Sequence, residues 1–449
     1  MCKIIKLRRG LDMNLKGGLS AGSPVTETKA SLVAVIPDDF PGFVPKLSVH
    51  EGDEVECGSE LLHDKNCEEI KLVSPVSGKV KEIVRGERRK ILRVIVEADS
   101  AGNNSKAFDV SGIDKKENLT EVLMESGLWA MMRQRPYDII PTPGTTPVNI
   151  FISAFDSSPL APTLADSVKG KEREIAEGIR ALARLTLGKV YVSTRQGEEC
   201  PLPEEATHII IEGPHPAGNA GVQAANIAPV NKGETIWTLD IITAARIGTL
   251  LTSGKTDWST EVALVGSDVK TPKTVKTAVG CRIKDIVKDD IKTSDHHLRI
   301  ISGNVLTGTA ETADGFLHYP YRQVTVIPEG DDVDEFMGWA SMSPEKMSVS
   351  HSFLSSFMKK KKFAPDARLH GGRRAMIMSE QYDKVMPMDI LPEYLVKAIL
   401  AKDIDQMEKL GIYEVAPEDF ALCEYIDPSK LELQKIVREG LDYLRKELE

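Results

Sequence analysis

The chain has 449 residues, room for about three domains at roughly 150 residues each, so it can bury a substantial core. Its 67 acidic and 57 basic side chains give a net charge of -10, which argues against a nucleic-acid-binding protein because such proteins carry a basic stripe. Six scattered cysteines indicate reduced cytosolic thiols. Because the sequence has no long apolar run, we expect no membrane-spanning helix and no secretory signal.

Short β signals separated by Gly, Pro and Asp turns fill residues 30–98 of an N-terminal β domain that we place at 1–105. The stretch "VHEGDEVECGSELLHDKNCEEIKLVSPVSGKVKEI" resembles biotinyl and lipoyl carrier domains in its Gly-Asp turn and its Ser-Pro-x-Ser-Gly turn. This resemblance implies a barrel-sandwich fold with Lys65 near a hairpin tip, where carriers hold their modified lysine. Because Lys65 is distant from Pro75 and has no Met neighbours, we expect a structural sandwich without modification.

Helices and strands alternate in the next domain, which we place at 106–256. Ile175 and Ile179 share the apolar face of a helix that ends at Gly188, and "KVYVST" and "HIIIEG" are strands. The stretch "ETIWTLDIITAARIGTLLTSG" predicts a second long helix that ends at Gly254. This alternation predicts a Rossmann-like, open α/β sheet with helices on its faces.

A loop rich in proline and glycine, "GPHPAGNAG", directly follows the second of these strands. Open α/β sheets place ligand crevices at the carboxyl ends of their strands, and glycine permits close approach of a ligand or another chain. The loop is neither a Walker loop nor a GxGxxG turn. Its histidine can act as an acid, as a ligand or as a donor to a quinone oxygen, and the alternative is a structural histidine. The candidate site residues are Gly213, Pro214, His215, Pro216, Gly218 and Gly221.

Short strands return in residues 257–332, where "TEVALVG", "HLRIISG" and "RQVTVIPEG" flank a short helix through "KTAVGCRIKDIV" and fit a β-grasp-like domain. Residues 333–449 predict a helical domain. One helix follows Pro387, and the last helix begins at an Asp-Pro pair with a Ser429-x-x-Glu432 capping box. The apolar face of that last helix consists of Leu433, Val437, Leu441 and Leu444.

A basic segment, "SSFMKKKKFAPDARLHGGRRAM", interrupts this acidic chain. Such a run is usually a solvated face, but its interleaved Phe and Met side chains favour docking on anionic headgroups or on a membrane partner, at about 1 kcal/mol for each basic side chain. The candidate docking residues are Lys359, Lys360, Lys361, Lys362, His370, Arg373 and Arg374. The neighbouring His296 and His297 point to opposite faces of a strand, so no metal site is predicted there.

Six blocks resemble the A-subunit family of the sodium-pumping NADH:quinone reductase, a bacterial respiratory complex. They are "SGLWAMMRQRP" at 126–136, "NIFISAFDSSPLAP" at 149–162, "GPHPAGNAG" at 213–221, "RIISGNVLTG" at 299–308, "ARLHGGRRAM" at 367–376 and "DKVMPMDILP" at 383–392. The resemblance implies a peripheral subunit on the cytoplasmic face of the bacterial inner membrane, whose chief partner is a membrane-embedded subunit. The complex passes electrons from NADH through flavins and an iron–sulfur centre to quinone and exports Na(+).

The resemblance also implies that this chain holds no tightly bound cofactor, with quinone as its candidate ligand. The family is related to the Rnf complex and to the flavin-binding subunit of respiratory complex I, which holds flavin in a glycine-rich loop. Here the corresponding stretch carries the bulky Trp129, Met131 and Met132, which obstruct the approach of a flavin phosphate. The stretch "EDFALCEYIDPSK" is similar to a ferredoxin motif but keeps only Cys423 and Pro428, and one thiolate cannot hold a four-iron cluster.

The sequence therefore favours a subunit that acts at the quinone end or in assembly, with activity only in the assembled complex. A free-standing flavin- or NAD-dependent dehydrogenase is the main alternative, and a carrier modified on Lys65 is a third. No local signature of Ser-His-Asp, Cys-His or paired-carboxylate catalysis identifies catalytic residues.

Overall fold

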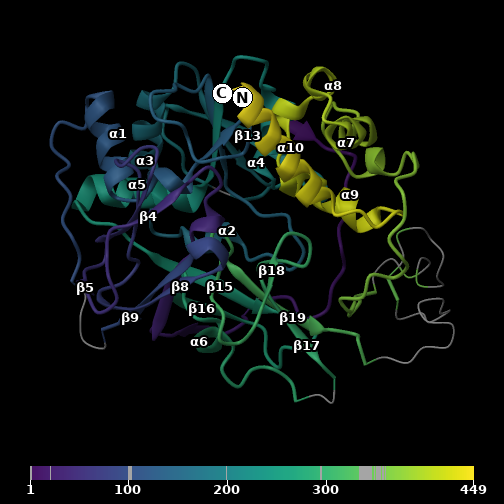
Figure 1. Ribbon diagram of the computed structural model, residues 1–449, viewed down its shortest axis with the longest axis horizontal. Coiled ribbons are helices and arrows are strands. Elements are labelled where there is room, and N and C mark those ends of the chain that lie inside the picture. The colour runs from purple at the N-terminus through teal and green to yellow at the C-terminus, as the bar shows by residue number, and fades with distance from the viewer. Residues whose placement is uncertain are drawn as a thin grey trace.

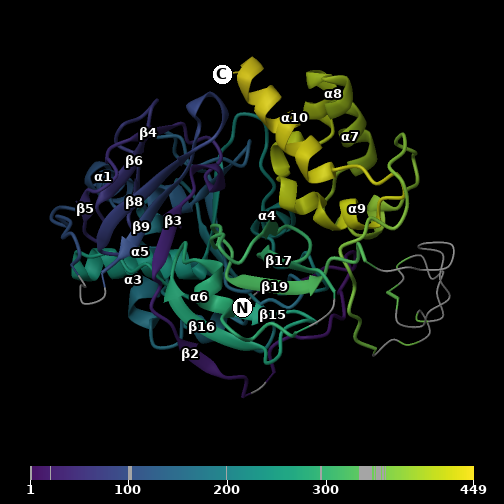
Figure 2. The ribbon, with the colours of Figure 1, turned by 60° about the horizontal axis from the view of Figure 1, so that its bottom comes forward.

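A computed structural model describes residues 3–20, 22–99, 104–198, 200–293, 296–332, 346–347, 349, 355, 358 and 361–448. Within these ranges the strands form two six-stranded sheets, one four-stranded sheet and one three-stranded sheet. The β-rich N-terminal segment, the two larger sheets and a group of C-terminal helices pack into one body (Figures 1 and 2). None of the helices in the described ranges combines the length and the apolar character needed to cross a bilayer.

Two small antiparallel sheets form the N-terminal part, in the strand orders β3-β9-β8-β5 and β4-β6-β7. Their bounds are β3 (Leu32–Val35), β4 (Pro45–Leu47), β5 (Glu54–Val55), β6 (Glu60–Asp64), β7 (Lys71–Val73), β8 (Gly78–Arg85) and β9 (Ile91–Ala98). Alternate side chains such as Val33, Leu62 and Val94 are fully buried between them, as expected for half-buried strands. Lys65 lies exposed in the turn between β6 and β7, as the hairpin pattern predicts.

The central sheet has the strand order β1-β13-β12-β11-β14-β10, in which only β10 is antiparallel to its neighbour. Its strands are β1 (Lys3–Lys6), β10 (Arg133–Arg135), β11 (Asn149–Ser153), β12 (Val190–Thr194), β13 (Ala206–Glu212) and β14 (Ile236–Asp240). Its helices are α1 (Lys116–Glu125), α2 (Leu164–Ser167), α3 (Glu172–Leu185), α4 (Ala220–Ile227) and α5 (Ile241–Ser253). The carboxyl ends of the parallel strands therefore meet at one edge of the sheet.

Helices α3 and α5 cross at two glycines. A Cβ on Gly178 would lie 1.9 Å from the Ala244 carbonyl oxygen, and one on Gly248 would lie 1.7 Å from that of Glu174. Only a residue without a side chain permits the two backbones to approach so closely. The predicted apolar face of α3 is buried, and α5 ends at Gly254 in the left-handed conformation, so both predictions are confirmed.

The third sheet has the strand order β18-β17-β19-β15-β16-β2. Its elements are β2 (Val25–Glu27), β15 (Ser259–Val265), β16 (Lys273–Ala278), β17 (Leu298–Ser302), β18 (Thr309–Glu311), β19 (Gln323–Pro328) and the helix α6 (Ile283–Val287). The first residues of the chain thus supply an edge strand to each of the two larger sheets, β1 to the central sheet and β2 to the third sheet.

Among the described residues, the C-terminal segment contains four α-helices and three short 3-10 helices. They are η5 (Tyr382–Lys384), α7 (Pro392–Ala401), α8 (Ile404–Lys409), η6 (Ile412–Glu414), η7 (Pro417–Phe420), α9 (Ala421–Ile426) and α10 (Leu433–Leu448). The four leucine and valine residues predicted for the apolar face of α10 are all fully buried.

Several sequence predictions of element boundaries are wrong. Helix α3 ends at Leu185 and not at Gly188, and the predicted helix around α6 begins only at Ile283 because β16 runs to Ala278. The predicted helix at 234–254 is a strand followed by a helix, because Asp240 caps the helix by accepting from the Thr243 N–H at 2.7 Å, and the apolar residues before it fill a sheet position. The predicted helix after Pro387 breaks into α7 and α8 at Lys402, which is in the left-handed conformation. The last helix begins at Leu433, beyond the predicted capping box, because the Asp427 side chain accepts from Ser429 and Leu431 N–H groups.

A half-buried histidine, His318, joins the third sheet to the N-terminal part. His318 Nδ1 lies 2.6 Å from Asp39 Oδ1, and its Nε2 lies 3.1 Å from Glu311 Oε1. Because both carboxylates accept, both ring nitrogens donate, which favours the imidazolium form. Burial opposes that charge, but the hydrogen bonds and charges of Asp39 and Glu311 raise the pKa of His318 overall. Next to it, the ring of Tyr319 stacks on Phe40 with centroids 5.2 Å apart.

We predict that His318→Gln destabilises the protein by about 1.5–3 kcal/mol, the range for hydrogen bonds to charged groups. Since the folded pKa of His318 is raised, the stabilisation is fully present below the unfolded pKa of about 6.5 and is lost as pH rises through the folded pKa. Thermal melting of wild type and variant at pH 6 and pH 9 measures this, with the exposed His50→Gln as control. An equal difference at both pH values would contradict the prediction.

Candidate functional site

The loop that the sequence singled out begins directly after β13, at the carboxyl edge of the central sheet, as predicted. The loop lies largely inside the protein. His215, Pro216 and Gly221 are buried, while Gly213, Pro214 and Gly218 are half-buried. It lies beside the segment that follows β11 and against η7 of the C-terminal helices, because Ser157 and Glu418 both contact it.

His215 is held by residues from two other segments. Its Nδ1 lies 3.0 Å from Ser157 Oγ, and its backbone N–H donates to Asp12 Oδ1 at 2.9 Å. Ser157 Oγ also accepts from the Gly218 N–H at 2.8 Å, so its own hydroxyl proton is free to point to Nδ1. This arrangement favours the tautomer that carries its proton on Nε2. Burial lowers the pKa of His215, so a neutral imidazole with an Nε2–H donor is favoured at neutral pH.

The glycines of the loop make room for this chain's own atoms. A Cβ on Gly213 would lie 2.8 Å from the Leu7 side chain, and one on Gly218 would lie 2.5 Å from the Ser157 backbone nitrogen. A Cβ on Gly221 would lie 1.9 Å from the guanidinium of Arg135. Intramolecular packing therefore accounts for all three glycines without a ligand.

The backbone donors in the middle of the loop, from His215 to Asn219, are likewise occupied. The Ala217 N–H donates to the Pro214 carbonyl at 3.0 Å, and the Asn219 N–H donates to the Pro216 carbonyl at 2.9 Å. The N–H groups of His215 and Gly218 donate to side chains, and the two prolines have none. A phosphate is bound by a series of free N–H groups, so the segment from Pro214 to Asn219 does not form a phosphate cradle.

A buried ion pair lies behind the loop. Arg135, only 2% exposed, donates to Asp419 Oδ2 at 2.7 Å and also to the Glu414 backbone carbonyl. Asp419 Oδ2 accepts in addition from the Ala416 N–H at 2.9 Å. This pair connects the edge strand β10 to the C-terminal helical segment. Loss of one partner would leave a buried charge without its counter-ion.

Glu418 adds a second titratable group beside the loop. Desolvation of its carboxyl group and the charge of the neighbouring Asp419 carboxylate raise the pKa of Glu418 to about 8, while the charge of Arg135 opposes this rise. About half of the side-chain surface, 48%, remains exposed, so the group can exchange protons with solvent. The site therefore combines a neutral imidazole donor at His215 with a carboxylic acid at Glu418, and can donate hydrogen bonds or protons to an acceptor oxygen.

The stretch 126–136 is packed with side chains. Trp129, Met131 and Met132 are buried, and Trp129 Nε1 donates to the Pro141 carbonyl at 2.8 Å. The Trp129 ring packs edge-on against Trp237 with centroids 5.1 Å apart. Cys423 is also fully buried, in α9. Among the described residues, no group of three His, Cys, Asp or Glu side chains is placed to hold a metal ion.

The basic residues lie on another segment. Lys359 and Lys360 lie outside the described residues, Lys361 is half-buried, and Lys362 is exposed. The remaining docking candidates, His370, Arg373 and Arg374, are exposed, and each contacts another group of this chain. His370 Nε2 lies 3.6 Å from Asp366 Oδ1, Arg373 donates to Glu432 at 2.7 Å, and the Arg374 N–H donates to the Ser429 carbonyl at 3.0 Å.

Sequence reasoning missed Arg135, Ser157 and the acids of η7. They are separated from the loop by as many as about two hundred residues, and no local spacing relates them. Arg135 lies inside the block "SGLWAMMRQRP". The correspondence of this block to a flavin loop does not predict a buried arginine. Gly221 was the one residue in the loop that could have pointed to Arg135. A glycine is required at this position because the buried Arg135 guanidinium lies where a side chain would be.

The fold and the site define a multi-domain α/β chain with an N-terminal barrel sandwich. Three family models match it: the NqrA N-terminal barrel-sandwich hybrid domain at residues 5–99, the NqrA second alpha/beta domain at 114–256, and the NQRA C-terminal domain at 261–312. The chain belongs to the NqrA family, the A subunits of the Na(+)-translocating NADH-quinone reductase, which the sequence blocks predicted. The prediction of a mixed α/β protein with a barrel-sandwich domain is also confirmed.

Relatives from several bacteria support this assignment over the whole chain. The A subunit of the Na(+)-translocating NADH-quinone reductase of Serratia proteamaculans (strain 568) is 35% identical, covering 99% of this chain and 100% of that protein. The proteins of the same name from Hahella chejuensis and Neisseria meningitidis serogroup C are 35% and 33% identical at the same coverage. Among solved structures, an air-oxidized NAD+-reducing [NiFe]-hydrogenase matches with a TM-score of 0.38 and 12% identity, covering 75% of this chain and 62% of that chain.

We predict that Gly221→Ala destabilises the protein by about 1–3 kcal/mol, the usual cost of overpacking. The new Cβ would collide with the Arg135 guanidinium, which cannot move without lengthening its bond to Asp419. Thermal melting measures the effect. Gly372→Ala is the matched control because a Cβ there meets nothing within 4 Å. Equal melting temperatures for the two variants would contradict the prediction.

Proposed function

We propose that this chain is a peripheral subunit of a Na(+)-translocating NADH:quinone oxidoreductase, which couples electron transfer from NADH to quinone with sodium export. The main observation in support is that the A subunit of the Na(+)-translocating NADH-quinone reductase of Serratia proteamaculans is 35% identical over 99% of the chain. The chain acts at the quinone end of the complex or in its assembly, and its activity exists only with the other subunits.

The site around His215 supports the quinone-end role. A quinone carbonyl accepts hydrogen bonds, and on reduction it accepts protons. His215 offers an Nε2–H donor, and Glu418, which contacts the loop at Asn219 and has a pKa of about 8, offers an exchangeable proton. We assign quinone or partner binding to the loop from Gly213 to Gly221 on this basis.

We also propose that the chain has no tightly bound cofactor of its own, so NADH, flavins, the iron–sulfur centre and Na(+) belong to the whole complex. The buried side chains of Trp129, Met131 and Met132 support this, since they fill the stretch that corresponds to a glycine-rich flavin loop. The occupied N–H groups of residues 215–219 oppose binding of a flavin or nicotinamide phosphate along this part of the candidate loop.

Location and partners follow from the same proposal. The protein lies on the cytoplasmic face of the inner membrane and contacts a membrane-embedded subunit, with no role for nucleic acid. The exposed cations of Lys362, Arg373 and Arg374 support docking at an anionic or membrane-proximal surface. We divide the chain into domains at 1–105, 106–256, 257–332 and 333–449. The parallel strand order of the central sheet supports a Rossmann-like type for the second domain, and the mixed sheet with α6 supports a β-grasp-like third domain.

A free-standing flavin- or NAD-dependent dehydrogenase is the second candidate, favoured only by the parallel central sheet. We predict that the purified chain shows no flavin absorption and leaves added NADH unoxidised. The measurement is an ultraviolet–visible spectrum before and after NADH addition. A yellow protein that bleaches with NADH would transfer support to the dehydrogenase.

We predict that His215→Ala in the assembled complex raises the KM for quinone about tenfold, matching one lost hydrogen bond of roughly 1.4 kcal/mol. NADH oxidation with ferricyanide as acceptor is expected to stay unchanged, because that step does not need the quinone end. His50→Ala is the control, since its side chain is 93% exposed. An unchanged KM for quinone would remove His215 from the proposed site.

A further inference from the structure

A cavity of about 510 Å³ lies between the central sheet and the C-terminal helices. Its walls come from residues 230–232, which join α4 to β14, from 389–391 before α7, and from 408–414 across the end of α8 and η6. This volume falls within the range of about 300–1,000 Å³ typical of ligand pockets. The cavity is distinct from the His215 loop, although Arg135 reaches both regions.

One wall of the cavity is apolar. Val230 and Ile390 are buried there, Leu410 is half-buried, and Leu391 remains 53% exposed. A Cβ on Gly411 would lie 2.7 Å from Ile390 Cγ2, so the absence of a side chain at Gly411 lets the chain pass close to this wall. The wall suits an aliphatic stem.

The cavity lining also carries charges, and two of its carboxyl groups stand apart from the rest. Lys232 Nζ lies 2.7 Å from the Glu408 carboxylate, which also accepts from Tyr413 Oη at 2.5 Å, so these three groups satisfy one another. Asp389 and the Glu414 carboxyl group have no hydrogen-bond or ion-pair partner within the described part of the chain. Among the described residues that line the cavity, Lys409 on the rim is the one cation outside the Lys232–Glu408 pair.

We propose that this cavity receives a basic side chain, Arg or Lys, from a segment of a partner protein in the complex, with its aliphatic stem on the apolar wall and its charge between Asp389 and Glu414. A long cationic side chain combines these two properties. The inference rests on the proposed function, which supplies a partner polypeptide. It goes further by assigning a contact surface and the charge of the partner residue.

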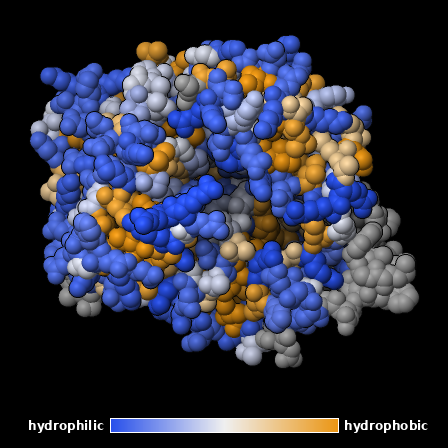
Figure 3. All heavy atoms as spheres, viewed as in Figure 1, coloured by the Kyte–Doolittle hydropathy of each residue, from blue (hydrophilic) through white to orange (hydrophobic). Residues whose placement is uncertain are grey.

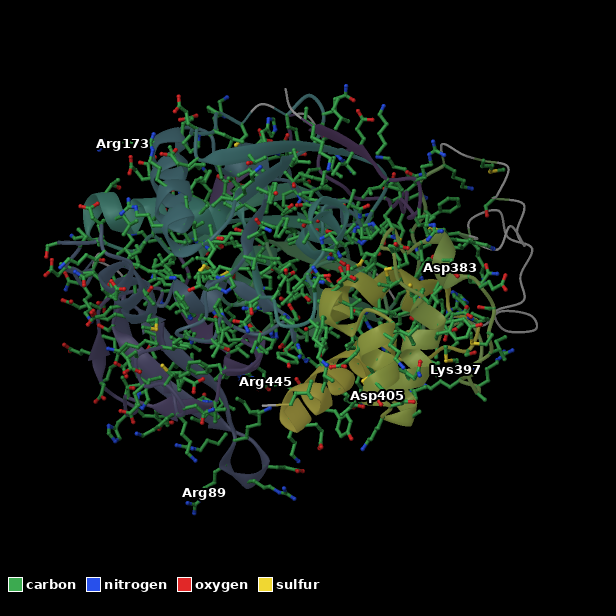
Figure 4. The ribbon with its side chains drawn as sticks, turned by 90° about the horizontal axis from the view of Figure 1, so that it is seen from above. Arg89, Arg173, Asp383, Lys397, Asp405 and Arg445 are labelled. Atoms are coloured by element: carbon green, nitrogen blue, oxygen red, sulfur yellow. The ribbon has the colours of Figure 1, made fainter. Side chains whose placement is uncertain are left out.

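The surface around the cavity supports a polypeptide occupant. Leu391, just before α7, and Tyr394 and Leu400 on α7 are 53%, 57% and 54% exposed, with the exposed Lys397 between the last two. Figure 3 shows hydrophobic surface over this part of the molecule, and Figure 4 shows Lys397 and Asp405 on the outer side of the same helical group. A segment that inserts its basic side chain into the cavity would also cover some of these exposed apolar side chains, beginning with Leu391 at the cavity itself.

Occupancy depends on pH. Burial of the Glu414 carboxyl group and the neighbouring Asp389 charge raise its pKa to about 7, against the effect of Arg135. An inserted cation favours the ionised form, so binding releases a proton and strengthens from pH 6 to pH 8. The charged and titratable groups that surround Glu414 are Arg135, Lys232, Asp389, Glu408, Lys409 and Tyr413.

Two measurements test the proposal. First, n-butylguanidinium chloride is titrated into the isolated full-length chain, and its Kd is expected to rise about tenfold in the Asp389→Asn/Glu414→Gln double variant. Lys409→Met removes the competing rim cation and is expected to tighten binding.

Second, the double variant is purified with the other subunits of the complex in rising salt, where it is expected to dissociate at lower salt than wild type. Asp405→Asn, on the exposed side of α8, is the matched control, and melting curves establish that each variant folds.

The outcomes separate this proposal from the proposed function. If the wild-type chain never co-purifies with the other subunits, the proposed function fails, while the titration still tests the cavity. If the probe binds and is lost in the double variant but assembly is unchanged, the occupant is a free organic cation and the partner assignment is overturned. If neither probe binding nor assembly changes, the cavity has no cationic occupant and the inference fails.

Discussion

The buried ion pair between Arg135 and Asp419 fixes how the two halves of the site meet. Arg135 comes from an edge strand of the central sheet, and Asp419 from the C-terminal helical segment. A guanidinium with 2% exposure is stable there only because it has its counter-ion and a backbone carbonyl as acceptors. Gly221 must lack a side chain because this guanidinium occupies the space beside it. The position of the loop, and with it that of His215, therefore depends on this charge pair.

The same pair links two regions with different chemistry. On one side the His215 loop offers a neutral donor and an exchangeable carboxylic acid, which suit an acceptor oxygen. On the other side Arg135 holds the Glu414 carbonyl, while the Glu414 carboxyl group lies on the wall of the cavity. Insertion of a partner residue into the cavity would thus act on the backbone that positions Arg135. An assembly contact and a quinone-end site would share one structural support.

Periodicity predicted those elements whose burial repeats regularly along the chain. The predictions of the apolar faces of α10 and α3 were correct because each helix packs one continuous face against the core. Strand β14 was missed because its apolar residues run directly into α5, and only the Asp240 cap separates the two elements. The position of the loop at the carboxyl edge followed from the α/β alternation. Its contacts with Ser157 and Glu418 could not be predicted, since they join segments distant in sequence through tertiary packing.

Glycine content alone gave the wrong physical reason for the loop. Three glycines after a strand indicate close backbone approach, and the sequence suggested a ligand or another chain as the approaching group. The approaching atoms belong to Leu7, Ser157 and Arg135 of the same chain, and the N–H groups of His215, Ala217, Gly218 and Asn219 are already occupied. What remains available for chemistry is His215 Nε2 and the Glu418 carboxyl group. Such groups exchange protons and donate to a carbonyl oxygen, which is the basis of the quinone role that we propose for this edge of the sheet.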